Sequence, residues 1–227
     1  MEKNLLFDLY GTLINIHTNE DSLLFWDSVK EELFIDSKLS CEEIKNKYLH
    51  YCMELSKEKE EIEILDVFKL LGFENKNEAL MAAKRFRELS TTFIKLYSNV
   101  KETLIELKAL GFKLYVLSNA QTAFTVPELK KLGIYDLFDR IAISSDYKFK
   151  KPNLEFYKRA MLDFNISSGI MIGNDYECDV LPAKEIGLGS IFIRSNITPY
   201  EPNYWKRSDL DYFDKKQLID KILSFYK

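Results

Sequence analysis

The stretch DLYGTL, residues 8–13, directly follows the apolar run Leu5–Phe7. A short apolar run that ends in a turn is typical of a strand buried in a parallel sheet. This predicts that Asp8 lies at the carboxyl end of a strand, where it can act as a nucleophile or a metal ligand. Gly11 allows a tight turn that brings backbone amides and the Thr12 hydroxyl close to a bound anion. Ligands bind at this edge of an open parallel sheet, so the stretch predicts both a fold and a site.

Polar residues also follow the next two predicted strands. Ser118 and Asn119 come directly after the apolar run 112–117, and both are short neutral groups that suit phosphate or carboxylate oxygens. Lys151 follows a third predicted strand, and a lysine there can neutralise developing negative charge. The sequence therefore predicts an anionic substrate.

A fourth strand end carries oxygen ligands. The apolar run Ile170–Ile172 leads into Gly173, and then into Asn174, Asp175 and Asp179. Hard oxygen ligands of this kind suit Mg²⁺. Each of these features is weak alone, because strand-end aspartates often cap helices and lysine runs are often solvated. Four such strand ends in chain order are a much more specific signal.

From residue 99 onward the pattern is one of alternating helices and strands. Val100, Leu104 and Leu107 form a helical stripe, Gly111 is a natural helix terminator, and a strand follows. The same pattern then repeats to residue 193. Alternation of this kind predicts an α/β fold with a parallel sheet and helices on both faces.

The segment between Ile14 and about Tyr97 differs, because it shows no convincing strand run and contains only one glycine, Gly72. Its apolar residues recur at helical spacing. The stripes are Phe25, Val29 and Leu33; Ile44, Tyr48, Tyr51 and Leu55; and Phe86, Leu89, Phe93 and Tyr97. This predicts a helical insert over the carboxyl edge of the sheet, where a lid belongs. A helical subdomain that only adds bulk would have the same periodicity.

Composition narrows the class of protein. With 227 residues, of which 46% are hydrophobic, the chain can bury a sizeable core. Its net charge of −4, with both signs interspersed, offers no basic face, so nucleic acid and membrane surfaces are not expected partners. Aromatic residues at 200–205 and 212–213 fit either packing of the tail on the core or a ligand or subunit contact, such as that of a homodimer.

The cysteines and histidines indicate an intracellular protein without a zinc site. Three cysteines form no C-x-x-C pair, which suits reduced thiols, and two histidines are too few for a histidine-rich zinc site. No apolar stretch approaches the roughly 18 residues of a membrane helix, and Asp8 interrupts any signal-peptide core. We therefore expect a cytoplasmic protein whose cysteines and histidines are structural or exposed.

In chain order, these residues resemble the four motifs of the haloacid dehalogenase-like (HAD) superfamily. Residues 8–13 resemble the first motif, 117–119 the second, 151–152 the third and 173–179 the fourth. The resemblance covers the whole chain and implies a Rossmann-like core with strand order 3-2-1-4-5 and an inserted all-helical cap. On this basis residues 1–14 and 97–227 form the core domain, and residues 15–96 form the cap.

The resemblance also implies roles for the site residues. Asp8 would be the covalent nucleophile, Thr12, Ser118, Asn119 and Lys151 would hold the anionic substrate, and Asp8, the Tyr10 carbonyl and Asp175 would bind Mg²⁺. Asp179 would be a second ligand or an orienter of the first ones.

Two positions depart from the usual phosphatase pattern. Phosphatases of the superfamily usually carry an acid–base aspartate where this chain has Tyr10, and a phenol with a pKa of about 10 is a poor base. Loss of a positioned acid–base group typically costs roughly 10²–10⁴-fold in rate. The usual first acid of the fourth motif is Asn174 here, which removes one charge but keeps an oxygen ligand.

Tyrosine at position 10 is typical of 2-haloacid dehalogenases. Those enzymes also carry an arginine early in the cap, whereas the first arginine of this chain is Arg85. Three hypotheses follow. We favour a slow Mg²⁺-dependent phosphatase of a small phosphorylated metabolite. The alternatives are a 2-haloacid dehalogenase and a catalytically weak protein that binds phosphate ligands or has a regulatory role.

Overall fold

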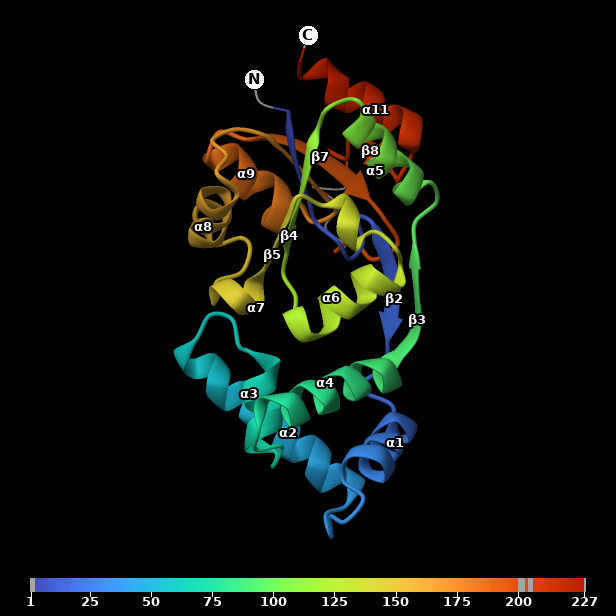
Figure 1. Cartoon of the computed structure of the whole chain (residues 1–227), viewed down its shortest axis with the longest axis vertical. Coiled ribbons are helices and arrows are strands. Elements are labelled where there is room, and N and C mark those ends of the chain that lie inside the picture. Colours follow the sequence, from blue (N-terminus) through green and yellow to red (C-terminus); the bar gives the residue numbers. More distant parts are fainter. Residues whose placement is uncertain (1–2, 200–202, 204–205, 227) are drawn as a thin grey trace.

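The computed structural model describes residues 3–199, 203 and 206–226 and divides into two parts (Figure 1). One part is a parallel sheet with helices on both sides, and the other is a bundle of four helices at the carboxyl edge of that sheet. In order, the elements are β1 (Asn4–Phe7), β2 (Ile14–Thr18), α1 (Leu23–Leu33), α2 (Cys41–Glu58), α3 (Ile64–Leu70), α4 (Lys76–Ser90), β3 (Thr91–Leu96), α5 (Val100–Ala109), β4 (Lys113–Ser118), α6 (Thr122–Lys131), η1 (Tyr135–Leu137), β5 (Arg140–Ile143), α7 (Ser144–Tyr147), α8 (Leu154–Phe164), β6 (Ile170–Gly173), η2 (Tyr176–Val180), α9 (Leu181–Glu185), β7 (Gly189–Arg194), β8 (Leu210–Asp211) and α11 (Lys215–Ser224).

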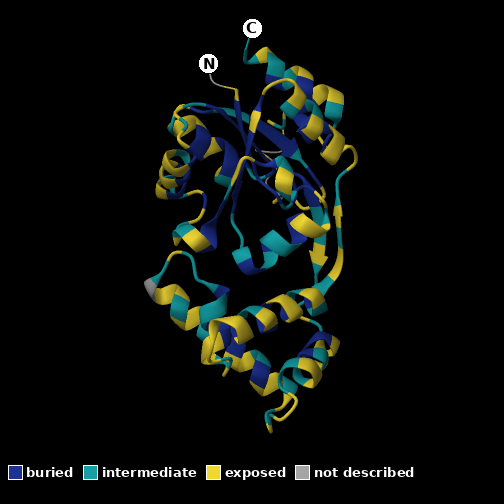
Figure 2. Ribbon diagram, viewed as in Figure 1, coloured by how far each residue is buried: buried dark blue, intermediate teal, exposed yellow. Residues whose placement is uncertain are grey.

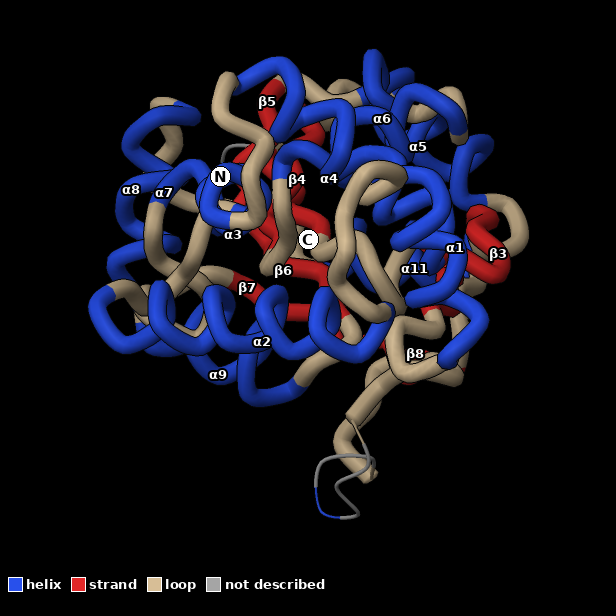
Figure 3. The backbone as a smooth tube through the Cα atoms, turned by 90° about the horizontal axis from the view of Figure 1, so that it is seen from below, coloured by secondary structure: helices blue, strands red, loops and turns tan. Residues whose placement is uncertain are grey.

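The large sheet has six parallel strands in the order β5-β4-β1-β6-β7-β8. Numbered within the core, this is the expected order 3-2-1-4-5, with β8 added as a short sixth strand at the edge. The predicted α/β fold is thus confirmed. Because all strands run in the same direction, their carboxyl ends meet at one edge, which faces the helical bundle (Figure 3).

Residues along each strand alternate between two hydrophobic clusters, one on each face of the sheet. Leu5 and Phe7 of β1 pack in the cluster that contains α5 and α11, whereas Leu6 packs with α8 on the opposite face. Both faces are therefore covered, and the strands lie in the dark-blue interior of Figure 2. Burial on both faces explains why the strands are continuous apolar runs in the sequence.

The inserted bundle has a hydrophobic core of its own. Trp26 of α1, Tyr48 of α2, Phe68 of α3 and Phe86 of α4 form one cluster of packed aromatic rings. The predicted stripes on α1 and α2 are both in helices. The helical insertion is thus confirmed, and we call this bundle the cap.

The two ends of the insert are strands, although an all-helical insert was predicted. β2 and β3 pair in an antiparallel ribbon that joins the core to the cap. The prediction of a single helical stripe from Phe86 to Tyr97 was wrong beyond Ser90, because α4 ends at Ser90 and β3 begins at Thr91. The β-branched pair Thr91 and Thr92 favours the extended backbone at this point.

The carboxyl-terminal segment packs on the core. Phe213 is buried in the same cluster as α5 and α11, in agreement with the packing interpretation, whereas the Tyr212 side chain is exposed. Of the aromatic stretch 200–205, only residue 203 is described, so the contact expected there lies mostly outside the described residues. The three cysteines are free thiols. None of the helices described is long and apolar enough to cross a membrane.

Candidate active site

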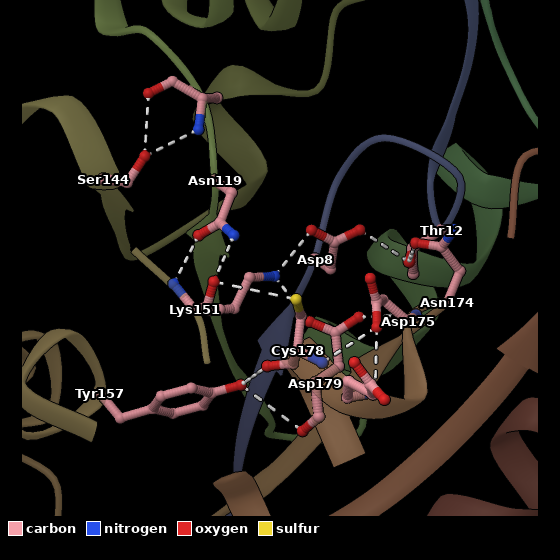
Figure 4. Close-up of polar contacts among 12 residues, drawn as sticks. Asp8, Thr12, Asn119, Ser144, Lys151, Tyr157, Asn174, Asp175, Cys178 and Asp179 are labelled. Carbon is pink, nitrogen blue, oxygen red and sulfur yellow. Dashed lines mark hydrogen bonds and ion pairs between the residues drawn. The ribbon is translucent and has the colours of Figure 1, made fainter. Parts of the chain in front are cut away.

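Asp8 is the first residue after β1, and its side chain lies at the carboxyl edge of the sheet (Figure 4). Its N–H donates to the Ile172 carbonyl at 2.9 Å, which extends the pairing of β1 with β6 by one residue. The carboxylate is largely buried, and Oδ2 accepts a hydrogen bond from the Thr12 hydroxyl at 3.0 Å. Thr12 therefore contacts the predicted nucleophile directly.

Lys151 is the positive charge of the site. Its Nζ donates to Asp8 Oδ1 at 2.8 Å and to Asp179 Oδ1 at 2.6 Å, and the side chain is only 2% exposed. Burial would lower the pKa of this amine, but the carboxylates of Asp179 and Asp8 outweigh it, and the pKa is raised. Lys151 is therefore a charged cross-link between the two carboxylates.

Asp179 is completely enclosed. Burial raises the pKa of its carboxyl above the usual range, while Lys151 counteracts this rise and Asp8 adds to it. Its Oδ2 accepts the Asp175 N–H at 3.0 Å. This packing requires glycine at 173, because a Cβ there would lie 2.1 Å from Asp179 Oδ2. Asp179 is thus placed to orient Lys151.

Asn119 contacts the backbone of Lys151 at two points. Its Nδ2 donates to the Lys151 carbonyl at 2.8 Å, and its Oδ1 accepts the Lys151 N–H at 2.7 Å. The amide expected to hold the substrate thus holds the lysine segment. Ser118 differs, because its hydroxyl is buried and has no hydrogen-bond partner among the described residues. Such an unsatisfied group is costly, and an oxygen of a bound anion would satisfy it.

Asn174 lies against the loop that follows Asp8. One of the two terminal atoms of its carboxamide faces this loop. That atom lies 3.1 Å from Asp8 Oδ2, 3.1 Å from the Tyr10 carbonyl oxygen and 3.2 Å from Thr12 Oγ1. Gly11 makes this approach possible, because a Cβ at that position would lie 2.2 Å from Asn174 Nδ2. Gly11 also has a φ of +90°, a conformation that suits glycine.

The Asp175 carboxylate uses one of its two oxygens to cap a helical turn. Its Oδ1 accepts the N–H groups of Glu177 and Cys178, at 3.0 and 2.9 Å, and so caps η2. Of this neighbouring pair, Asn174 makes the contact with the Asp8 carboxylate, while Asp175 lines the same cavity.

The hydroxyl of Tyr10 is turned toward α6. It donates to Glu128 and lies 3.1 Å from Thr125 Oγ1. Burial raises the pKa of the Tyr10 phenol, and Glu128 raises it further. The Tyr10 side chain is therefore not a base, whereas its backbone carbonyl faces Asn174.

Two residues of this network were not predicted from the sequence. Arg87, on cap helix α4, donates from Nε to Glu128 Oε1 at 2.7 Å, and both side chains are mostly buried. Its guanidinium also lies 5.8 Å from the centre of the Tyr10 ring. The cap is thereby connected to residues 9–13, which follow the predicted nucleophile and are called the nucleophile loop below. No local pattern marks Arg87 or Glu128, because their partners are distant in the sequence.

A second contact joins the cap to the core near Asn119. The Gln121 side chain accepts the Ile64 N–H at 2.8 Å and donates to the Ile62 carbonyl at 3.0 Å. Glu61 accepts a hydrogen bond from the Ser144 hydroxyl at 2.8 Å. The segment between α2 and α3 therefore rests on the core loops that follow β4 and β5.

The oxygen atoms around Asp8 fit a small divalent cation. Asp8 Oδ2, the Tyr10 carbonyl and the Asn174 amide oxygen are hard ligands of the kind that Mg²⁺ prefers. No cluster of three histidine, cysteine or acidic side chains suited to a metal occurs in the part of the chain that the structure describes. The candidate set therefore relies on one carboxylate, one carbonyl and one amide.

The cavity beside these groups has a volume of about 190 Å³. Its lining residues are Asp8, Tyr10, Asn119, Lys151, Asn174, Asp175, Cys178, Asp179, Ile197 and Pro199. It brings together residues from all four predicted strand ends in one small polar space. The arrangement offers a largely buried carboxylate beside a buried ammonium group.

Comparison with known proteins places this site in a family. The family profile described as haloacid dehalogenase-like hydrolase matches residues 5–193. A glyceraldehyde 3-phosphate phosphatase of Methanothermobacter thermautotrophicus is 29% identical over 128 residues, which are 56% of this chain and 57% of that protein. Over this match, the chain spans little more than half the length of that relative.

Two further proteins match over nearly the whole chain. The pyrophosphatase PpaX of Bacillus velezensis is 29% identical over 91% of this chain and 93% of its own. The crystal structure of a 2-haloacid dehalogenase from Pseudomonas syringae covers 100% of both chains, with 18% identity and a TM-score of 0.68, which shows a shared fold. The chain belongs to the haloacid dehalogenase-like hydrolases.

Proposed function

We propose that this hydrolase is a Mg²⁺-dependent phosphatase of small phosphorylated metabolites, with Asp8 as its nucleophile. The observation that carries the proposal is the environment of the Asp8 carboxylate. Oδ1 contacts the Lys151 ammonium, and Oδ2 faces the cluster of oxygen ligands. A positive charge of the chain and a bound cation would then lie on both sides of the group that meets the anionic phosphate.

The reaction has two steps. An oxygen of Asp8 attacks phosphorus, the bond from phosphorus to the leaving oxygen breaks, and an aspartyl phosphate forms. Water then attacks this intermediate, which releases inorganic phosphate and restores the carboxylate. Lys151 neutralises charge on the phosphoryl oxygens, and the unsatisfied Ser118 hydroxyl can donate to one of them. Bound Mg²⁺ would add further charge neutralisation at the same oxygens.

The leaving group receives little help from position 10. The Tyr10 hydroxyl is held by Glu128, and its raised pKa makes it a weak acid. Substrates whose leaving oxygen has a low pKa should therefore react fastest. An aryl phosphate should exceed an alkyl phosphate by a wider margin than in an enzyme with an aspartate at this position.

The substrate should be small. The cavity of about 190 Å³ leaves little space beyond a phosphoryl group and a short carbon chain. Two of the relatives are named for glyceraldehyde 3-phosphate and for pyrophosphate, which are both small. We include these two compounds, with phosphoglycolate and p-nitrophenyl phosphate, in the first substrate panel.

The test is release of inorganic phosphate from this panel with Mg²⁺ and with chelator. We expect Mg²⁺-dependent release that Asp8→Asn abolishes, and we expect no loss from Asp36→Asn, which changes an exposed aspartate remote from the site. Equal release by Asp8→Asn and by the unmodified chain would overturn the assignment.

A 2-haloacid dehalogenase is the second candidate, and Tyr10 favours it. Arg87 lies near the Tyr10 ring, but its charge is paired with Glu128, so it is not a free receptor for halide. The dehalogenase should release halide from 2-chloropropionate without added metal. Binding of phosphate without turnover of any substrate would instead indicate the third candidate, a phosphate-binding protein.

A further inference from the structure

Asn174 presents one edge of its carboxamide to the loop that follows Asp8. Its carboxamide edge faces Asp8 Oδ2 and the Tyr10 carbonyl, both at 3.1 Å. Neither of these oxygens carries a hydrogen. The Thr12 hydroxyl has a single hydrogen, which it can donate either to Asp8 Oδ2 at 3.0 Å or to an amide oxygen at this edge at 3.2 Å. An amide nitrogen at this edge has two hydrogens, one for Asp8 Oδ2 and one for the Tyr10 carbonyl, whereas an amide oxygen would face the lone pairs of both acceptors.

The opposite orientation suits a cation. Ligands at 2.0–2.1 Å in the near-octahedral shell of Mg²⁺ lie about 3 Å from one another at right angles. The Asn174 edge atom is 3.1 Å from Asp8 Oδ2 and 3.1 Å from the Tyr10 carbonyl, close to that spacing. With its oxygen turned inward, Asn174 would complete a set of three hard ligands. Asp8 Oδ2 and the Tyr10 carbonyl oxygen can therefore face either the amide nitrogen, without a cation, or the amide oxygen, with a cation between the three oxygens.

We propose that Asn174 is a two-state positioning residue: its NH₂ group cross-links Asp8 to the Tyr10 carbonyl when no cation is bound, and a half-turn of the carboxamide presents the oxygen when Mg²⁺ binds. The inference rests on the proposed Mg²⁺ dependence. Rotation of the Asn174 carboxamide by a half-turn needs little extra space, because the NH₂ group and the oxygen are similar in size. Asn174 is 5% exposed, and the missing Cβ of Gly11 leaves room for the amide.

The local charges explain why an amide and an acid would behave differently here. Asp8 and Asp179 already share the single positive charge of Lys151, so no cation of the chain is left over in this cluster for a third carboxylate. An aspartate at 174 would add such a carboxylate, 3.1 Å from Asp8 Oδ2. That change would strengthen cation binding, but without a cation it would replace a hydrogen bond by repulsion.

The test compares the unmodified chain with Asn174→Asp, and it uses Asp175→Asn as a second charge change in the same loop. Mg²⁺ binding is measured by calorimetry, and the midpoint of thermal unfolding is measured in Mg²⁺ and in EDTA. We expect Asn174→Asp to bind Mg²⁺ about tenfold more tightly or better, because ligand charge tunes affinity. We also expect its midpoint to fall in EDTA far more than that of the unmodified chain.

Asp175→Asn keeps a side-chain oxygen that can accept the Glu177 and Cys178 N–H groups, so its stability should change little, and by the same amount in Mg²⁺ and in EDTA. Equal affinities and equal EDTA responses of Asn174→Asp and the unmodified chain would overturn the two-state role and leave the phosphatase proposal intact. Absence of Mg²⁺ binding by both proteins would instead overturn the Mg²⁺ dependence, and the two-state role with it.

A second measurement covers the case in which Asn174→Asp does not fold. In the ¹⁵N-labelled unmodified chain, the Asn174 NH₂ signals should be protected from hydrogen exchange in EDTA. They should shift and lose protection as Mg²⁺ is added. If the Asn174 signals show no protection in EDTA, or do not respond to bound Mg²⁺, the two-state role is wrong.

Discussion

Asn119 holds the backbone of Lys151 by two hydrogen bonds, one to the Lys151 carbonyl and one from the Lys151 N–H. The two residues lie on different core loops, so this pair of bonds fixes the position of one loop on the other. Lys151 in turn contacts Asp8. A residue expected to bind substrate therefore determines where the charged end of a neighbouring side chain lies.

Replacement of Asn119 should act through Lys151. Asn119→Asp keeps an acceptor for the Lys151 N–H but places a carboxylate against the Lys151 carbonyl, whereas Asn119→Ala loses both bonds. We expect each variant to lose about 1–3 kcal/mol of unfolding free energy, because buried backbone groups lose their partners. Urea denaturation measures this loss. Stability equal to that of the unmodified chain would show that Asn119 does not hold the lysine segment.

Lys151 should be essential to the stability of the site as well as to its chemistry. Lys151→Met leaves Asp8 and Asp179 buried without a cation, which should cost about 3–5 kcal/mol. The double variant Lys151→Met with Asp179→Asn should regain part of this loss, because one of the two carboxylates is then neutral. Unfolding curves of the two variants test this, and identical stabilities would contradict the charge argument.

The ion pair between Arg87 and Glu128 should couple the cap to the nucleophile loop. Arg87→Met leaves the Glu128 carboxylate, which is 10% exposed, without its cation. We expect a loss of about 3 kcal/mol or more, and a smaller loss in the double variant with Glu128→Gln. A double-mutant cycle of unfolding free energies gives the coupling. Simple additivity of the two single changes would mean that the pair does not act as a unit.

Restoration of an acid at position 10 should improve catalysis selectively. Tyr10→Asp should raise turnover of an alkyl phosphate by up to roughly 10²-fold or more, and that of p-nitrophenyl phosphate much less. Tyr10→Phe is the control, because it also loses the bond to Glu128 but supplies no acid. If both variants change the two substrates equally, position 10 does not limit protonation of the leaving group.

Gly11 should be required for the approach of Asn174. Gly11→Ala places a side chain in a left-handed backbone conformation, which costs about 1–2 kcal/mol, and drives a Cβ into the Asn174 amide. Gly111→Ala is a matched control, because its φ of +82° is similar but nothing lies within 4 Å of the new Cβ. Only Gly11→Ala should also weaken Mg²⁺ binding, as calorimetry would show.

The fold was predictable because its signals are local. Apolar runs followed by polar turns marked β1, β4 and β6, and their parallel arrangement brings Asp8, Asn119 and Asn174 to one edge. The change from α4 to β3 was missed because Phe93 and Tyr97 continue the helical spacing of Phe86. β3 is stabilised instead by pairing with β2, which lies some 75 residues earlier in the chain.

The roles within the site were less predictable than its location. An amide such as Asn119 suits a substrate and a backbone segment equally well, and only the fold shows that Lys151 lies next to it. Tyr10 could be recognised as unusual, but its partners Glu128 and Arg87 come from two other elements. Contacts between distant residues of this kind leave no periodic signal in the sequence.

The most direct test of the central claim is detection of the covalent intermediate. The chain is mixed with p-nitrophenyl phosphate and Mg²⁺, quenched in acid within the first turnovers, and digested for mass spectrometry. We predict one phosphoryl group on the peptide that contains Asp8, and none in Asp8→Asn. Phosphate release without a phosphoryl group on Asp8, or the same modification in Asp8→Asn, would contradict Asp8 as the nucleophile.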